Sequence, residues 1–354
     1  MTCTATLAAC AHFGFRSASP KPFEHLSKQA RVAAIRHAQV WQPTEVSAMD
    51  IWMGPEDKKG FAPNATVLCD YAHQKSGGRS AKFLCAIAPG DEIKVKYGQT
   101  NGEVYAEVAA TRLLWALGFG ADHMYPLTVE CRNCPPDPAH EPQVRQRQVR
   151  FYPASVERKM PGETMESFLD SGWSWPELDL VSEPAGGAPR AHRDALKLLA
   201  VLLQHTDSKP SQQRLVCLHS HLDDGQCARP FMMVNDLGLT FGRASPWNTQ
   251  SESSVNLDEW TKTPVWSDSG GCVGNIAKSV TGTLDHPIIS EAGRAFLADL
   301  LMQLSDAQLH DLFAVARFPL RSLGTTPARP MTTVDQWVDV FKEKRDEIVN
   351  RSCA

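Results

Sequence analysis

Residues 204–218, QHTDSKPSQQRLVCL, decide the fold. They follow the strongly apolar run LKLLAVLL at 196–203, which predicts a buried helix over 191–204. Immediately after it, His205, Asp207 and Lys209 come at alternate positions. Packing does not require this triplet, whereas chemistry on a phosphate group would use it. We therefore expect a functional site where this helix ends.

The composition is that of a soluble globular protein. The chain has 354 residues, of which 42% are hydrophobic and 21% charged. This length suffices for one large domain or two modest ones. The net charge of −4 gives no reason to expect a nucleic-acid partner or general membrane binding. No run approaches about 18 apolar residues, so we expect no transmembrane segment.

Strand patterns dominate the first half of the chain and helix patterns the second. The expected helices are 23–38, 103–117 and 191–204. The chain is expected to turn helical from about 164, interrupted by a Trp- and Gly/Pro-rich loop at 171–189. More helices are expected at the C-terminal end, where Ser305-x-x-Gln308 and Thr333-x-x-Gln336 fit capping boxes. The expected strands are 66–71, 81–87, 92–98, 125–131 and 147–152, followed by a hairpin at 214–235 and an irregular stretch at 239–287. This order predicts an α+β fold with a β-rich and an α-rich lobe and a cleft between them.

The ten cysteines include three pairs with disulfide-like spacing. Cys69 and Cys85 flank a Gly-Gly turn symmetrically, and Cys217 and Cys227 flank a second hairpin in the same way. Cys131 and Cys134 form a CxxC motif. These pairs favour an oxidising compartment. Buried free thiols are one alternative, and a zinc site of Cys131, Cys134 and His140 is another, although no second CxxC supports it.

The first ten residues, MTCTATLAAC, are similar to the end of an export signal with a lipoprotein cleavage box. A basic start is missing and the apolar run is short, so residues 1–22 are either the remnant of such a signal or a disordered segment. Together with the cysteine pairs, this start favours an exported or cell-envelope location, and a cytoplasmic location is the alternative.

Four short motifs, in a fixed order along the chain, carry a resemblance to a known superfamily. HTDSKPSQ at 205–212 resembles the catalytic loop of protein kinases, H-R-D-L-K-P-x-N, and NDLG at 235–238 resembles their D-F-G turn. Lys94 or Lys96 is similar to the strand lysine of these enzymes, and Glu103 or Glu107 to its partner on the next helix. The resemblance covers about residues 60–320 and implies a two-lobed protein kinase-like fold.

The resemblance also implies roles and cofactors, namely ATP and Mg²⁺. The lysine would contact the nucleotide phosphates while the glutamate holds it in place. Asp236 would bind Mg²⁺, as would Gln212, which stands where kinases have an asparagine. Asp207 would orient or deprotonate the attacking hydroxyl, Lys209 would offset charge nearby, and His205 belongs to the same catalytic loop.

The choice between the two lysines and the choice between the two glutamates stay open. Lys94 and Lys96 lie on the same face of a strand, so periodicity does not separate them. We prefer Lys96 because a short Tyr97-Gly98 turn leads from it into the helix. We prefer Glu107 because it lies deeper in the helix, whereas Glu103 favours the helix N-terminus electrostatically.

The chain also departs from the kinase pattern. It has no G-x-G-x-x-G motif, and the turn with Gly77, Gly78 and Arg79 is the candidate phosphate cover in its place. The segment 156–162, with Glu157 and Lys159, falls where the resemblance puts the interlobe hinge that meets adenine. No A-P-E segment follows NDLG. These features indicate an atypical branch, HipA-like, phosphoinositide-kinase-like or secretory-pathway kinase-like.

We therefore expect a helix and extension at 23–62, a kinase-like N-lobe at 63–163 and a C-lobe at 164–354. The expected activity is transfer of a γ-phosphoryl group to a hydroxyl on a protein, lipid or small molecule. One alternative is an inactive pseudokinase or binding module. The other is a metal-dependent hydrolase, built on His205, Asp207, His219, His221, Asp223 and Asp224.

Overall fold

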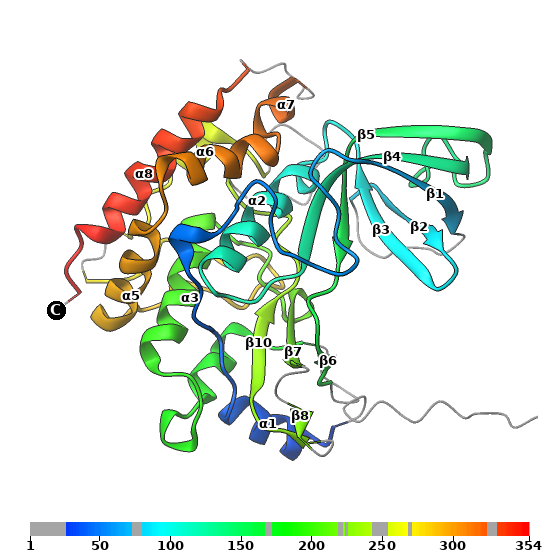
Figure 1. The fold of residues 1–354 in the computed structure, drawn as a ribbon. Coiled ribbons are helices and arrows are strands. Elements are labelled where there is room, and N and C mark those ends of the chain that lie inside the picture. Colours follow the sequence, from blue (N-terminus) through cyan, green and yellow to red (C-terminus); the bar gives the residue numbers. More distant parts are fainter. Residues whose placement is uncertain are drawn as a thin grey trace, which may run out of the picture.

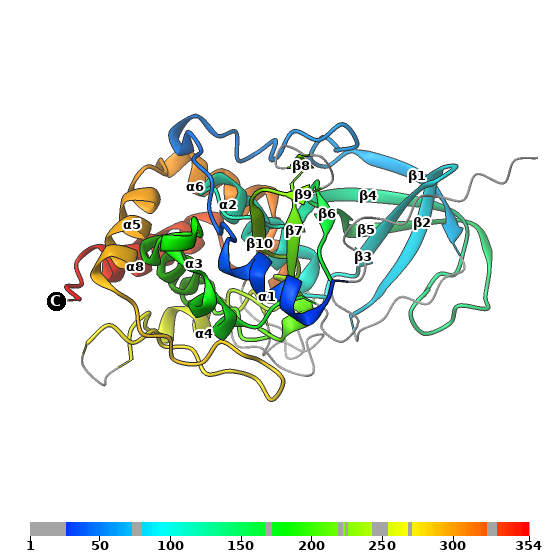
Figure 2. The same cartoon turned by 90° about the horizontal axis from the view of Figure 1, so that it is seen from below.

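The computed structural model describes residues 26–72, 80–166, 172–218, 222–223, 226–242, 254–267, 271–323 and 331–353. Figures 1 and 2 show the first five strands gathered at one end of the molecule and most of the helices at the other. The chain thus contains both helices and strands, as the sequence patterns predict. Within the described ranges, no helix has the length and apolar character needed to span a bilayer.

The strand end is a closed five-stranded barrel. Its order is β1 (Thr66–Ala72), β2 (Lys82–Ala88), β3 (Asp91–Tyr97), β5 (Gln146–Arg158) and β4 (His123–Cys134). Neighbours are antiparallel except β1 and β4, which pair in parallel and close the barrel. The five strands were expected, but closure was not. It depends on the parallel pairing of β1 with β4, which short-range patterns do not encode.

Side chains of β3 point alternately into the barrel and out of it. Ile93 and Val95 are buried in the barrel core beside Phe83 of β2. Lys94 and Lys96 therefore point to the opposite side of the sheet, and Lys82 lies directly across from Lys96 in the β2–β3 register.

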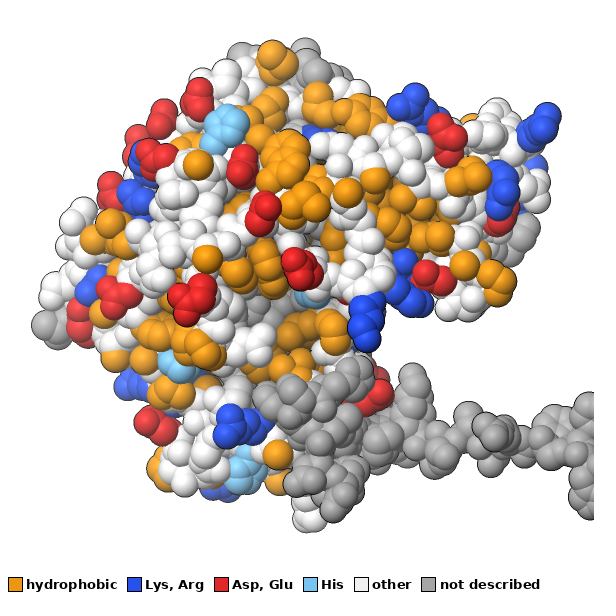
Figure 3. All heavy atoms as spheres, in the orientation of Figure 1, with side chains coloured by type: hydrophobic (Ala, Val, Ile, Leu, Met, Phe, Trp, Pro, Cys, Tyr) orange, Lys and Arg blue, Asp and Glu red, His pale blue; other side chains and the backbone are white. Residues whose placement is uncertain are grey.

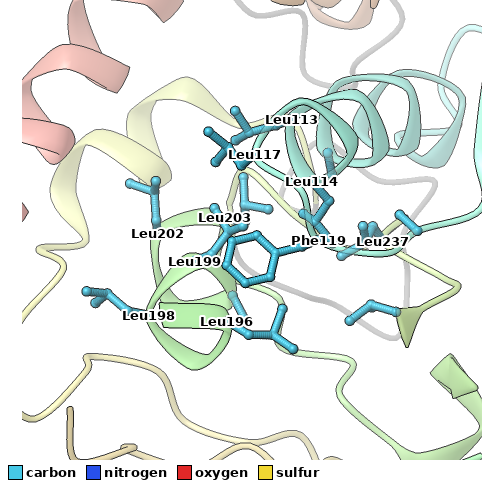
Figure 4. Packing of buried hydrophobic residues seen from close by; sticks show 14 of the residues in the cluster. Leu113, Leu114, Leu117, Phe119, Leu196, Leu198, Leu199, Leu202, Leu203 and Leu237 are labelled. Carbon is cyan, nitrogen blue, oxygen red and sulfur yellow. The ribbon is translucent and has the colours of Figure 1, made fainter. Parts of the chain in front are cut away.

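Helix α2 (Glu103–Ala116) packs between the barrel and the helical end. Nearly all of its residues are buried, because β4 covers one side and the helical part of the chain covers another. Figure 4 shows Leu113, Leu114 and Phe119 packed with leucines of α3 (Arg190–Leu203) and with Leu237. One hydrophobic core thus holds α2, the end of α3 and the NDLG turn in fixed relation.

The N-terminal extension begins on the helical end. Helix α1 (Lys28–Arg36) is shorter than the expected 23–38, and the residues before 26 lie outside the described part. Buried Arg31 donates to Glu177 Oε1 (2.5 Å) and to the Gly172 carbonyl (2.6 Å). Gln39 bridges to Phe231 of β10 (Pro230–Val234). The start of the extension therefore packs on the second half of the chain. Its end reaches the barrel, where the Tyr125 hydroxyl donates to the Pro55 carbonyl (3.2 Å) and Arg158 Nε donates to the Lys59 carbonyl (3.0 Å).

The segment before α3 contains the loop expected at 171–189, but the helix expected from about residue 164 is wrong for residues 164–166, and residues 167–171 lie outside the described part. The segment holds the short strand β6 (Glu163–Thr164) and the 3₁₀ helices η2 (Trp175–Leu180) and η3 (Glu183–Ala185). Prolines lie at the first turn of both 3₁₀ helices, and Gly186 follows with φ of 87°. These residues stop helix propagation within the loop. Residues 163–164 are extended because β6 pairs with the strand at Gln213–Cys217.

The hairpin and the helices of the C-terminal end follow the expectation. The stretch 239–287, expected to be irregular, contains a short helix at Leu257–Lys262, which the Asn256 side chain caps. Strand β7 (Gln213–Cys217) pairs with β10 and β6, while β8 (Leu222–Asp223) and β9 (Gln226–Cys227) form the tip. The helices are α4 (Leu257–Lys262), α5 (Glu291–Met302), α6 (Asp306–Val315), α7 (Phe318–Leu323) and α8 (Val334–Val349), with a short η1 (Val46–Ala48) in the extension. Both expected capping boxes are present, at Ser305 with Gln308 and at Thr333 with Gln336.

Four disulfides connect residues in the described part of the chain. The three expected pairs, Cys69–Cys85, Cys131–Cys134 and Cys217–Cys227, are all bonded. The zinc-site alternative is therefore wrong in this structure, and the imidazole of His140 contacts Asp137 instead. A fourth bond, Cys272–Cys353, joins residues 81 positions apart and gave no local signal.

Candidate functional site

Lys96 is the centre of a buried charge cluster. Its side chain is 1% exposed, and Nζ donates to Glu103 Oε2 (2.7 Å) and Glu107 Oε1 (2.5 Å). Asp236 Oδ1 lies 3.9 Å from the same nitrogen. Burial alone would lower the pKa of Lys96, but Asp236, Glu103 and Glu107 outweigh it and raise that pKa well above its ordinary value. The carboxylates therefore favour the charged form of Lys96.

The sequence left two lysines and two glutamates as alternatives, and the structure separates the lysines only. Lys94 pairs with Glu157 on β5, whereas Lys96 contacts both glutamates of α2. Because Glu103 and Glu107 lie one turn apart on the same helix face, one ammonium group reaches both.

Glu107 and Asp236 titrate in opposite directions. Burial raises the pKa of Glu107 well above its usual value, although Lys96 opposes this. Burial also acts on Asp236, but Lys96 outweighs it and lowers the pKa of that carboxyl. Of the pair, Glu107 therefore holds a proton more readily than Asp236, whose charged form Lys96 stabilises. The Gly238 N–H stabilises this charge by donating to Asp236 Oδ1 (3.2 Å).

Gly238 allows the NDLG turn to approach α2 closely. A Cβ at this position would lie 2.6 Å from Glu103 Cγ and 2.9 Å from Glu103 Cδ. The preceding Leu237 is 2% exposed and belongs to the core of Figure 4. The leucine anchors the turn, and the glycine lets Asp236 reach the Lys96 cluster.

The HTDSKPSQ loop places Asp207 beside this turn. Asp207 Oδ2 accepts hydrogen bonds from Lys209 Nζ (3.0 Å) and Gln212 Nε2 (2.9 Å). The Gln212 carbonyl accepts from the backbone N–H groups of Asn235 (2.9 Å) and Asp236 (3.3 Å). The two acidic segments are therefore joined directly through Gln212.

Support for this loop comes from the irregular stretch after α4. Ser208 is fully buried, and its Oγ accepts from the N–H groups of Thr283 (3.1 Å) and Leu284 (3.0 Å). Thr283 Oγ1 in turn donates to the Ser208 carbonyl (2.8 Å). Sequence patterns did not reveal the contact between Ser208 and Thr283. Thr283 lies 75 residues further along the chain, in an irregular segment with no pattern that marks it as a partner of the loop.

His205 lies beneath the loop. It is 1% exposed, and neither ring nitrogen has a hydrogen-bond partner among the described residues. Its ring centroid lies 6.1 Å from that of Trp175. Burial lowers the pKa of His205 to about 4, so the imidazole is neutral at pH 7.

A second charge network follows β5, where the sequence predicted a hinge. Glu157 contacts Lys94 and Lys159, and Lys159 Nζ also lies 2.8 Å from Asp122 Oδ2. Burial would raise the pKa of Glu157, but Lys159 and Lys94 outweigh it and hold that pKa below its usual value. Asp122, which is fully buried, also binds Arg214 and the Met160 N–H (2.9 Å).

A pocket of about 570 Å³ opens beside this network. Leu84, Asp91, Lys94, Glu157, Lys159 and Pro161 are among its lining residues. Figure 3 shows the molecule hollowed below the barrel, with lysine and arginine atoms along the upper edge of the hollow. Lys94 connects the pocket with the Lys96 cluster. It lines the pocket, and its charge contributes to lowering the pKa of Asp236.

Some expected site residues lie outside the described part of the chain. They are Gly77, Gly78 and Arg79 of the first turn, and His219, His221 and Asp224 of the hairpin tip. Asp223 is described only as part of β8, so the hydrolase set cannot be assembled from the structure.

The described groups suit phosphate and a hard cation. Lys82, Lys94 and Lys96 lie on one face of β2 and β3, which gives a row of positive charge. The amide of Gln212 and the carboxylate of Asp236 offer oxygen ligands, which Mg²⁺ prefers. The carboxylates of Glu103, Glu107 and Asp236 have oxygens within 4.8 Å of one another.

Comparison of the sequence with known protein families gives no match, and no curated protein matches it significantly. Among solved structures, the chain is similar to the proinflammatory kinase CtkA of Helicobacter pylori. The sequences are 8% identical, the match covers 81% of this chain and 96% of that one, and the TM-score is 0.44. This likeness is too low to assign the chain to a family.

Proposed function

We propose that the protein is an atypical kinase, which transfers the γ-phosphoryl group of ATP to a hydroxyl acceptor with the help of Mg²⁺. In this proposal the barrel with α2 is one lobe and the helical end is the other. One observation carries it: Lys96 contacts both α2 glutamates and Asp236, and Gln212 connects Asp236 to Asp207. An ion pair that only stabilised the fold would not need Asp207 to be hydrogen-bonded to Gln212, the residue that also holds Asp236.

The nucleotide is proposed to lie along β2 and β3. The pocket beside Glu157 and Lys159 has the size of a small-molecule site, and its backbone at 158–161 would meet the base. From there the phosphates would extend past Lys94 toward Lys96. Lys96 offsets phosphate charge, and Glu103 and Glu107 keep its side chain in place.

Asp236 and Gln212 are the proposed ligands for Mg²⁺. When bound, the cation would neutralise charge on the phosphate oxygens. Ionised Asp236 is suited to this because its pKa is depressed and its carboxylate remains partly exposed. Gln212 offers its amide oxygen while the amide nitrogen stays on Asp207.

Asp207 is proposed to accept the proton of the attacking hydroxyl. Its carboxylate is 19% exposed, so an acceptor can reach it, and the bonds from Lys209 and Gln212 fix its orientation. Lys209 would then offset the charge that develops on the transferred group. His205, buried and neutral, is proposed to position the loop through packing rather than to touch substrate.

The disulfides bear on the location of this activity. Pairs such as Cys217–Cys227 persist in oxidising compartments, so we propose that the protein acts outside the cytoplasm, where ATP must be supplied to it. The HipA-like, phosphoinositide-kinase-like and secretory-pathway kinases remain the branches to which the motifs of this chain are most similar.

The test is transfer of labelled phosphate from ATP to a panel of hydroxyl acceptors, including the protein itself. We expect transfer by the wild type, and a loss of at least about 100-fold in Asp207→Asn and Asp236→Asn. The control is Asp299→Asn, an exposed aspartate on α5. Magnesium-dependent ATP binding without transfer would favour the binding-module alternative, and absence of binding would overturn the proposal.

A further inference from the structure

We propose that four cysteines of the barrel core, Cys69, Cys85, Cys131 and Cys134, hold one zinc ion when they are reduced. These residues are called the four-cysteine cluster below. In this structure they form the disulfides Cys69–Cys85 and Cys131–Cys134. The two disulfides and the zinc site are the oxidised and the reduced state of the same cluster. The inference goes beyond the proposed function and does not depend on phosphoryl transfer.

The two disulfides contact each other inside the barrel. Cys85 Sγ lies 3.5 Å from Cys131 Sγ, and the sulfurs of Cys69, Cys85 and Cys131 all lie within 4.8 Å of one another. Cys134 Sγ is bonded to Cys131 and therefore belongs to the same group. Four thiolates on a tetrahedral zinc ion, with Zn–S bonds of about 2.3 Å, lie about 3.8 Å apart. The contact between the two disulfides is close to this spacing.

Closure of the barrel brings the four cysteines together from distant segments. Cys69 of β1 lies opposite Cys131 in the parallel register with β4, and Cys85 lies on β2, the other neighbour of β1. Cys131 and Cys134 form the CxxC at the end of β4, which has the ligand spacing of structural zinc sites. The barrel thus supplies the second pair of thiols that the sequence lacked beside its CxxC. His140, the third ligand considered from the sequence, is not part of this set.

The surroundings of the cluster are apolar. All four cysteines are 0% exposed and belong to the same hydrophobic core as Phe83 and Val95. Reduction would remove two covalent links between strands or within β4, and four zinc–sulfur bonds would replace them. Thiolates select soft or borderline metals such as zinc over Mg²⁺ and Ca²⁺. The competing state is four neutral thiols, which pack as small apolar groups and bind no metal.

The conversion between the two states needs a reductant, and a dithiol is the chemical class that supplies it. Two dithiols are oxidised to disulfides, and the two disulfides of the cluster accept their four electrons. The four resulting thiolates bind Zn²⁺, and the four protons of the dithiols are released to solvent. Because chains are synthesised in a reducing cytoplasm, the zinc state would come first, and the disulfides would form in the oxidising compartment proposed above.

The first experiment measures metal in protein that is produced in a reducing cytoplasm and purified anaerobically with dithiothreitol. We expect about one zinc per chain, and Co²⁺ in its place should give the visible absorption of a tetrahedral cobalt thiolate. The double variant Cys131→Ser/Cys134→Ser should lose both signals. The control Cys272→Ser/Cys353→Ser removes a pair that packs on the helical core, and should bind zinc as the wild type does. No zinc in the reduced wild type, or unchanged zinc in the first variant, overturns the proposal.

The second experiment compares the two redox states of the wild type, so it decides the proposal even where a variant does not fold. Oxidation of the zinc-loaded protein should release its zinc to a chromogenic chelator, and mass spectrometry should then find Cys69–Cys85 and Cys131–Cys134. Added zinc should raise the melting temperature of the reduced protein and leave that of the oxidised protein unchanged. Zinc retained after both bonds have formed, or an equal effect of zinc on both states, contradicts the proposal.

Discussion

The side-chain amide of Gln212 donates a hydrogen bond of 2.9 Å to Asp207, the carboxylate at the centre of the HTDSKPSQ loop. The carbonyl of the same Gln212 accepts from the N–H of Asp236 at 3.3 Å. A single residue therefore sets the position of one acidic group relative to the other. This relationship makes Gln212 the most informative position at which to perturb the site.

Gln212→Ala should lower phosphoryl transfer by about 10- to 100-fold, because Asp207 loses a donor that fixes its orientation. Gln212→Asn keeps the amide but withdraws it by one methylene, so its activity should lie between the two. Steady-state kinetics check this, with the loss expected in kcat rather than in KM for the acceptor. A Gln212→Ala protein as active as the wild type would contradict the role of this hydrogen bond.

Gly238→Ala should destabilise the protein by about 1–3 kcal/mol, because the new Cβ would meet the Glu103 side chain at 2.6 Å. Denaturant unfolding measures the free energy. In a Glu103→Ala background the same substitution should cost less, because the colliding atoms are gone. Equal costs in both backgrounds would show that the turn does not press on α2.

Replacing Cys272 and Cys353 together by serine should lower the free energy of unfolding by about 2–4 kcal/mol. The bond closes a segment of 81 residues, so its loss releases much chain entropy in the unfolded state. Urea titrations of wild type and double variant without reductant measure the effect. An unchanged midpoint would mean that the two sulfurs are not bonded in solution.

Stability should fall as the pH is lowered from about 7 to about 4, partly through His205. Its folded pKa of about 4 lies below the ordinary value of 6.5, so the unfolded chain binds more protons throughout that interval. The contribution is fully present above about pH 6.5 and declines as the pH approaches 4, by about 3 kcal/mol in total.

His205→Gln should therefore flatten the pH dependence of the free energy of unfolding by that amount. His310→Gln, at an exposed position on α6, should leave the pH dependence unchanged. If both variants have the slope of the wild type, His205 is not buried and neutral in the native state.

Local sequence patterns predicted most of the helices and strands and the lysines and acidic residues of the Lys96 cluster, because these patterns lie within short segments. Alternation in EIKVKYG placed Lys94 and Lys96 on one face, and the structure has them there. Hairpin symmetry predicted Cys69–Cys85 and Cys217–Cys227 for the same reason.

What the sequence did not reveal depends on contacts between distant segments. The parallel pairing of β1 with β4 and the attachment of Ser208 to Thr283 have no local signature. The choice between Glu103 and Glu107 had no answer in the sequence, since Lys96 contacts both.

The measurement that tests the central claim most directly is calorimetric titration of ATP with Mg²⁺ into the wild type and Lys96→Met. The wild type should bind ATP, and Lys96→Met should bind it at least about tenfold more weakly, because the buried ammonium that is proposed to meet the phosphates is gone. Lys278→Met, at a side chain 53% exposed, should bind as the wild type does. Absence of ATP binding by the wild type, or equal affinity in Lys96→Met, would contradict a nucleotide site at the Lys96 cluster.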